Sequence, residues 1–327
     1  TYNADFSVPK IGPNFPKFLN AKEFLAVEDL AYKNMEKYDP AGWAAGKYAG
    51  RNPALARTDP RIFDSNGNPL YDTDWLKEAT QHRISQNHQL GFSNGNEKSS
   101  YAVSLGYRND EGLIKTSYLK RYSARFTFDD QIKKWLKVGG TLSYNNQEEN
   151  LVDFDYLPMR MIAEGLPFLP VKYADGTWAD NRDYPNAEGS FSPLHYLYDR
   201  KYILNTQTTI GSFYSNISLA KGLEMRTVLG ANILSQGTNT YTGRTLSISQ
   251  KGIAASSNGR ESFWSLENYL TYNKRFAEKH AFTGMLGLAW QETNAFGLSA
   301  SIQNFSSDFF QFNNLGAGST SPGYGTN

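Results

Sequence analysis

Residues 91–95 are the closest approach to a catalytic motif in this sequence, because they have the G-x-S-x-G spacing of serine hydrolases. That motif activates its serine only on a sharp turn from a strand into a helix, beside an oxyanion hole. Here Ser93 ends one stretch of alternating residues, and Asn94-Gly95, a preferred hairpin dipeptide, leads into another. The spacing therefore predicts a hairpin turn between two strands and no hydrolase.

Residues that bind metals and cofactors elsewhere are scattered along this chain. Its four histidines are His82, His88, His195 and His280. None has metal-ligand spacing to an acidic residue, and there is no cysteine. Asp153 and Asp155 lack the glycine and the ladder of ligands of a calcium loop. No P-loop and no complete dinucleotide fingerprint occurs. We therefore expect no catalytic residue, no metal and no cofactor.

The connection over residues 148–202 holds the best candidates for binding. It carries rings beside carboxylates and guanidinium groups, a mixture that suits stacking on sugars and hydrogen bonds to hydroxyls. The same residue types are enriched at protein–protein interfaces. We predict that four of them contact a ligand or a lid protein: Arg160, Trp178, Asp180 and Tyr184. For each residue, an ordinary place in a solvated loop stays open as the alternative.

Composition argues against a nucleic-acid-binding protein and favours two classes of β protein. The 33 Lys and Arg residues balance 32 Asp and Glu residues, so nothing suggests a nucleic-acid partner. Aromatic residues make up 14% of the chain, although its mean hydropathy is only −0.56. Transmembrane β-barrels and secreted glycan-binding sandwiches both combine these properties. No apolar run is long enough for a transmembrane helix.

Period-two alternation is the main structural signal. Between Tyr101 and Arg108, apolar residues alternate with small or charged ones, and the pattern recurs in four further stretches, residues 122–128, 136–144, 223–233 and 282–290. A sandwich would also alternate. A membrane barrel is favoured because rings sit near the strand ends, as in interfacial aromatic belts.

The lengths of the connections support the same choice. Short turns are expected at residues 94–98, 129–134, 220–222 and 277–279, and long connections at residues 9–83, 109–119, 148–202, 236–261 and from 294 onwards. Short periplasmic turns opposite long extracellular loops are typical of outer-membrane barrels. Asn20 and Glu23 have the spacing of a capping box and predict one helix in the first loop.

We therefore expect an all-β fold, a transmembrane antiparallel β-barrel to which this chain contributes about nine strands. An odd number of antiparallel strands cannot close a barrel, and an open edge is costly in lipid. The chain is expected to be part of a barrel, without its true N-terminus.

Six stretches of this sequence form a recognisable set of motifs. They are S-N-G-N-E-K-S-S-Y-A-V-S-L-G-Y at residues 93–107, N-D-E-G-L-I-K at 109–115, K-R-Y-S-A-R at 120–125 and W-L-K-V-G at 135–139, with T-D-W at 73–75 and Q-N-H at 86–88. In these stretches the chain resembles the SusC/RagA family of TonB-dependent transporters. The resemblance covers most of residues 1–150 and continues more loosely to about residue 300. It implies that residues 1–327 are the N-terminal part of a barrel of about 22 strands, without the plug domain, the TonB-contact segment and the C-terminal strands.

The resemblance also implies a function and partners. Such a transporter lies in the outer membrane of a Gram-negative, Bacteroidetes-like bacterium, among lipid and lipopolysaccharide. It imports oligosaccharides, or alternatively peptides as RagA does, under a SusD-like surface lipoprotein, and a TonB complex acts through the plug. It is not an enzyme. An outer-membrane enzyme and a secreted glycan-binding β-sandwich remain as alternatives from other classes.

Overall fold

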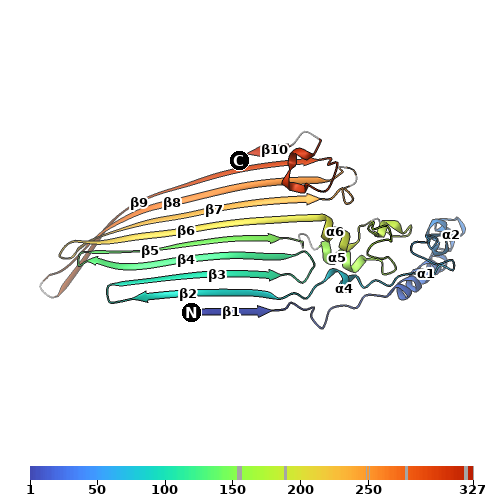
Figure 1. Cartoon of the computed structure of the whole chain (residues 1–327), viewed down its shortest axis with the longest axis horizontal. Coiled ribbons are helices and arrows are strands. Elements are labelled where there is room, and N and C mark those ends of the chain that lie inside the picture. The colour runs from blue at the N-terminus through green and yellow to red at the C-terminus, as the bar shows by residue number, and fades with distance from the viewer. Residues whose placement is uncertain are drawn as a thin grey trace.

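The computed structural model describes residues 1–152, 157–187, 190–247, 249, 251–276, 279–319 and 323–326. Its main feature is one antiparallel sheet of ten strands, in which each strand pairs with the next along the chain (Figure 1). The strands are β1 (Tyr2–Ser7), β2 (Ser85–Gly95), β3 (Ser99–Glu111), β4 (Tyr118–Lys133), β5 (Leu136–Asn150), β6 (Arg200–Ala220), β7 (Leu223–Thr242), β8 (Ile253–Phe276), β9 (His280–Gln303) and β10 (Gly323–Thr326). No second sheet faces it in the part of the chain that is described, so the fold is a barrel segment and the sandwich alternative is wrong.

Short helices gather at one end of the sheet (Figure 1). They are α1 (Ala21–Tyr38), α2 (Pro40–Ala44), η1 (Ala49–Arg51), α3 (Pro53–Ala56), α4 (Trp75–Ala79), α5 (Leu157–Glu164), η3 (Asn181–Asp183), α6 (Pro193–Asp199), η4 (Gln311–Asn313) and η5 (Leu315–Ala317). The expected capping box is confirmed, because the Glu23 amide donates to Asn20 Oδ1 and the Asn20 amide to Glu23 Oε2. Among the described residues, no helix has both the length and the hydropathy needed to cross a membrane.

Register joins the alternating apolar residues of successive strands into one continuous surface, which we call the apolar face. One row of directly paired residues runs across seven strands: Tyr101, Phe128, Gly140, Phe213, Leu229, Leu266 and Trp290. Many of these side chains are open, with Trp290 59% exposed and Phe213 44% exposed. An apolar surface this continuous is far larger than a soluble monomer usually exposes, and lipid would cover it.

The opposite surface, which we call the polar face, carries small and hydrogen-bonding side chains. On β9, for example, Thr283, Ala289 and Gln291 alternate with the apolar residues. This division is the one that a barrel with a wet interior requires.

The tight turns lie at the end of the sheet opposite the helices (Figure 1). Gly95 and Ser99 bound the β2–β3 turn, and Lys133 and Leu136 the β4–β5 turn. Gly222 closes the β6–β7 turn at a φ of 81°, which favours glycine. These three turns confirm the expected short connections at this end of the sheet. The β4–β5 turn is shorter than the expected residues 129–134, because β4 continues to Lys133, and the connection expected over residues 109–119 shrinks to residues 112–117. Residues 277 and 278 of the fourth expected turn lie outside the described residues.

Several strands are longer than the sequence predicted. β7 continues to Thr242, β8 starts at Ile253 and β9 reaches Gln303, so the connection expected over residues 236–261 shrinks to residues 243–252. The end of β7 carries Gln and Thr on one face and Gly and Asn on the other, so alternation disappears there. On β9 the alternation persists, because Phe296, Leu298 and Ile302 continue the apolar face to the end of the strand. The tail expected as a loop forms β10, which pairs with β9, so the sheet has ten strands where about nine were expected.

Candidate binding face and loop domain

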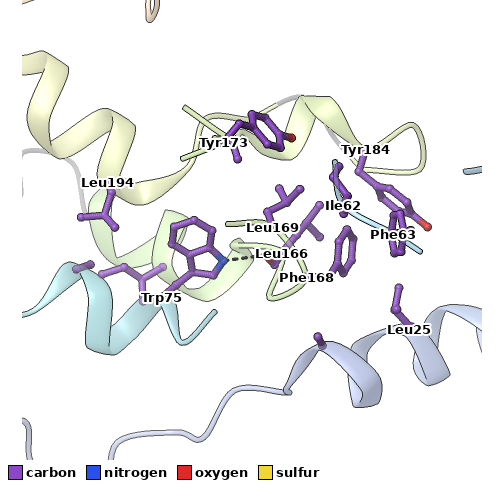
Figure 2. Close-up of a cluster of buried hydrophobic side chains, with 14 of the residues drawn as sticks. Leu25, Ile62, Phe63, Trp75, Leu166, Phe168, Leu169, Tyr173, Tyr184 and Leu194 are labelled. Carbon is purple, nitrogen blue, oxygen red and sulfur yellow. Dashed lines mark hydrogen bonds between the residues drawn. The ribbon is translucent and has the colours of Figure 1, made fainter. Parts of the chain in front are cut away.

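The described parts of the first and third long connections fold together into a small domain, which we call the loop domain (residues 11–83, 151–152, 157–187 and 190–199). Its core is aromatic and fully buried, with Phe168 and Ile62 each 0% exposed (Figure 2). The Phe168 ring contacts the rings of Phe63 and Tyr184, with centroid distances of 5.3 and 4.8 Å. Trp75 Nε1 donates to the Leu166 carbonyl at 2.9 Å (Figure 2). Neither connection buries such a core alone, so the two stabilise each other.

Glu28 on α1 links the two connections by polar contacts. Its carboxylate accepts hydrogen bonds from the Tyr184 hydroxyl at 2.8 Å and from Asn186 Nδ2 at 3.0 Å. Arg57 Nη2 lies 2.7 Å from Glu28 Oε2 in a largely buried ion pair. Burial and the hydrogen bond to Glu28 raise the pKa of Tyr184 well above its usual range. Tyr184 therefore stays protonated and donates.

His195 on α6 is at the centre of a second buried polar cluster. Its Nδ1 lies 2.9 Å from both carboxylate oxygens of Asp180, and its Nε2 lies 2.9 Å from Thr245 Oγ1 in the β7–β8 connection. Asp199 Oδ2 is 3.4 Å from the same Nε2. Burial lowers the pKa of His195, but the two carboxylates outweigh it, so that the pKa is raised overall. The cluster thus ties the loop domain to a third connection.

Trp178 covers this cluster. Its ring stacks on His195 with a centroid distance of 5.3 Å and an interplanar angle of 12°, and its Nε1 donates to Asp199 Oδ2 at 3.2 Å. Lys172 Nζ lies 4.0 Å from the centroid of the same ring. Tyr198 stacks at 6.1 Å. The indole is half-buried and already in contact with several rings and a cation.

The four residues predicted to bind a ligand or lid thus have different environments. Arg160 is exposed on α5, and its Nε donates to Glu164 Oε1 at 2.8 Å. Trp178 is half-buried, while Asp180 and Tyr184 are only 1% and 2% exposed and bond to groups inside the loop domain. Contact of these four with a ligand stays a prediction. His195 was missed because its partners come from three separate segments, although Ser192-Pro193 before it has the form of a helix start.

Protonation of His195 is expected to stabilise the loop domain. A raised folded-state pKa contributes stability that is complete below the unfolded value of about 6.5 and is lost as pH rises through the folded value. The charged groups nearby are Asp180, Asp199, Arg182 at 3.1 Å from Asp180, and Lys172 over Trp178. Cleavage of the loop domain by protease should therefore speed up as the pH rises from about 6.5 through the raised folded-state pKa of His195. His195→Gln should be cleaved faster overall with a flatter dependence on pH. An unchanged slope in the variant would contradict this role.

The polar face offers hydrogen-bonding groups in a register row near the loop domain. Gln147 on β5, Thr206 on β6 and Gln236 on β7 are directly paired, and Arg121 on β4 is opposite Gln147. Within the described residues, the side chains of Gln147, Thr206 and Gln236 make no hydrogen bond. Uncommitted amides and hydroxyls are the groups that bind sugar hydroxyls or peptide bonds. This row is therefore a candidate binding surface that the search for motifs in loops did not find.

The other sequence features weighed for chemistry were the serine motif at Ser93 and the possible metal ligands. Ser93 lies within β2 and pairs with Ala102 of β3, which confirms a hairpin in place of a nucleophile elbow. The described residues contain no group of three or more His, Asp or Glu arranged to hold a metal. Asp153 and Asp155 lie outside the described residues.

No family model matches the chain. Several curated relatives do, of which three are described. The TonB-dependent receptor P26 of Formosa agariphila is 24% identical over 93% of this chain and 28% of its own length. Receptor P39 of the same organism is 28% identical over 69% of this chain and 22% of its own length. The TonB-dependent receptor SusC of Bacteroides thetaiotaomicron is 33% identical over 19% of this chain and 7% of its own length.

The same fold occurs in solved structures. A structure of the RagAB peptide transporter superposes on 99% of this chain and 38% of its own chain, with a TM-score of 0.71 and 22% sequence identity. The open-open state of the RagAB peptide importer gives a TM-score of 0.69. The chain therefore has the fold of part of a RagA-like barrel, and its sequence is similar to TonB-dependent receptors of the SusC type. This SusC/RagA-like segment spans 28% or less of the length of the curated relatives named above.

Proposed function

We propose that the intact protein imports a nutrient across the outer membrane of a Gram-negative bacterium. The apolar face, with tight turns at one end and the loop domain at the other, supports this proposal because it suits a barrel wall in lipid. Similarity to TonB-dependent receptors along 93% of the chain supports it further. The loop domain would then be extracellular.

The plug, the TonB-contact segment and the remaining strands would belong to other parts of the intact protein. The relatives' greater length supports this division, with the present chain as the N-terminal part of the barrel. A SusD-like lipoprotein would close the extracellular side, and a TonB complex would act through the plug. No bond is made or broken in the substrate. A pull-down of the tagged protein from outer membranes should recover such a lipoprotein; recovery of the transporter alone would count against the lid.

An oligosaccharide is the substrate class that the polar face favours. Neutral amides and hydroxyls dominate the row of Gln147, Thr206 and Gln236, and they match sugar hydroxyls in both donor and acceptor capacity. A peptide is the second candidate. Arg121 and Arg125 lie on the same face and would pair with carboxylates, and the structural relative is a peptide transporter.

Removing amides from the polar face should weaken substrate binding. In the intact protein, Gln147→Ala with Gln236→Ala is expected to lower affinity about tenfold or more, since each hydrogen bond contributes roughly 1 kcal/mol. Binding would be measured by calorimetry with neutral oligosaccharide and peptide libraries presented separately. Asn146→Ala is the matched control, because Asn146 neighbours Gln147 but lies on the apolar face, opposite Gln207. Equal affinity of the double variant and the control for both libraries would contradict the proposed binding surface.

A further inference from the structure

A cavity on the apolar face has no place in the proposed transport route. It measures about 650 Å³, and its floor is formed by strands β3 to β7 where they approach the loop domain. Tyr118, Asn150, Ile203 and Asn239 form one register row across this floor. Successive residues alternate between faces, so these side chains share their face with Tyr122, Tyr144 and Phe213. The cavity therefore opens on the side that faces lipid.

The cavity is positively charged. Four cationic residues line it, Arg83, Lys120, Arg200 and Lys201, against two carboxylates, Glu111 and Glu148. Glu111 is 3.9 Å from Arg83, and Glu148 accepts a hydrogen bond from Tyr118 at 2.9 Å. In the described part of the chain, neither Lys120 nor Lys201 forms an ion pair or a hydrogen bond. Lys120 Nζ lies 5.2 Å from the centroid of the Tyr118 ring, a cation–π contact that uses none of its N–H donors. Both ammonium groups can therefore donate to an anionic ligand.

The position of the cavity along the strands indicates which kind of anion it would meet in a membrane. Lys120 is two residues beyond Tyr122 on the same face of β4, and Tyr122 pairs with Tyr107 on β3. Below this pair of rings the apolar face continues through Ala124, Phe126 and Phe128. Rings of this kind mark the boundary between hydrocarbon and headgroups. Lys120 is therefore at headgroup height, with an acyl-chain surface directly beneath it.

We infer that this cavity binds the phosphorylated headgroup of a glycolipid in the outer leaflet. Phosphate oxygens pair with Lys120 and Lys201, and the acyl chains lie on the apolar face of β4 and β5. The inference rests on the proposed outer-membrane location. It concerns the lipid side of the wall and does not depend on import, so binding of lipid and uptake of substrate fail separately.

The test uses the intact protein purified in a neutral detergent. Binding is measured in mixed micelles containing diphosphoryl lipid A, with the same lipid after removal of its phosphates and with inorganic phosphate as further probes. Each lysine near a membrane surface contributes about 1 kcal/mol, so Lys120→Gln with Lys201→Gln should weaken binding of the phosphorylated lipid roughly 30-fold. Lys22→Gln with Lys98→Gln removes the same charge from exposed sites away from the cavity and should leave binding unchanged.

A third variant, Lys120→Arg with Lys201→Arg, keeps both charges and should bind almost as well as the unchanged protein, which separates loss of charge from misfolding. Tight binding of the dephosphorylated lipid would overturn the inference, as would an equal loss of affinity in the control variant. Displacement of the lipid by an equal concentration of inorganic phosphate would identify a site for free phosphate and overturn the lipid assignment.

Discussion

Replacing Phe168 by alanine is expected to unfold the loop domain while the sheet stays in the membrane. The side chain is 0% exposed and contacts the rings of Phe24, Phe63 and Tyr184, so it joins the first long connection to the third. Truncating a buried phenylalanine costs about 3–5 kcal/mol. Since a whole domain is stabilised by only about 5–15 kcal/mol, a loss of this size removes much of the stability of so small a unit.

The measurement is limited proteolysis of the intact protein, with cleavage sites mapped by mass spectrometry. Phe168→Ala should be cut within residues 21–79 and 157–187 at a protease concentration that spares the unchanged protein, while heat-modifiable migration of the barrel persists. Leu55→Ala is the matched control, because Leu55 is 67% exposed and its truncation should cost less than about 0.5 kcal/mol. If both variants resist protease equally, the aromatic cluster does not hold the loop domain together.

Sheet and faces follow from the sequence because their causes are local. Alternation at Tyr101, Val103, Leu105 and Tyr107 places these side chains on one face whatever lies beyond, and the register confirms it. The Asn20–Glu23 capping box needs only four residues. Prediction weakened at the end of β7, where both faces are polar. It also stopped short on β9, although Phe296, Leu298 and Ile302 extend the period-two signal there.

The loop domain could not be predicted in the same way. Its core joins Ile62 and Trp75 to Phe168, segments about a hundred residues apart with no shared period, so only the folded chain brings them together. Asp180 and Tyr184 were chosen because acids and rings suit sugar binding. Those residue types equally suit internal hydrogen bonds, and here they bond to His195 and Glu28. Residue type therefore shows which hydrogen bonds a side chain can make, and burial decides whether its partner is a ligand or another residue of the protein.

A lysine introduced on the apolar face is expected to destabilise the barrel more than one introduced at the next residue, on the polar face. Leu288 and Ala289 are neighbours on β9, but Leu288 is on the apolar face, 56% exposed, and Ala289 is on the polar face opposite Glu267 of β8. Leu288→Lys is expected to destabilise the barrel by about 2–4 kcal/mol, because it places an ammonium group in hydrocarbon near the midplane. Ala289→Lys adds the same side chain beside a carboxylate and should cost much less.

The readout is the urea midpoint of folding of the intact protein in lipid vesicles. Comparable losses in the two variants would mean that the apolar face does not meet lipid. The comparison holds the introduced side chain, its depth and the added charge nearly constant, so the difference between the variants reports which side of the sheet the lipid occupies.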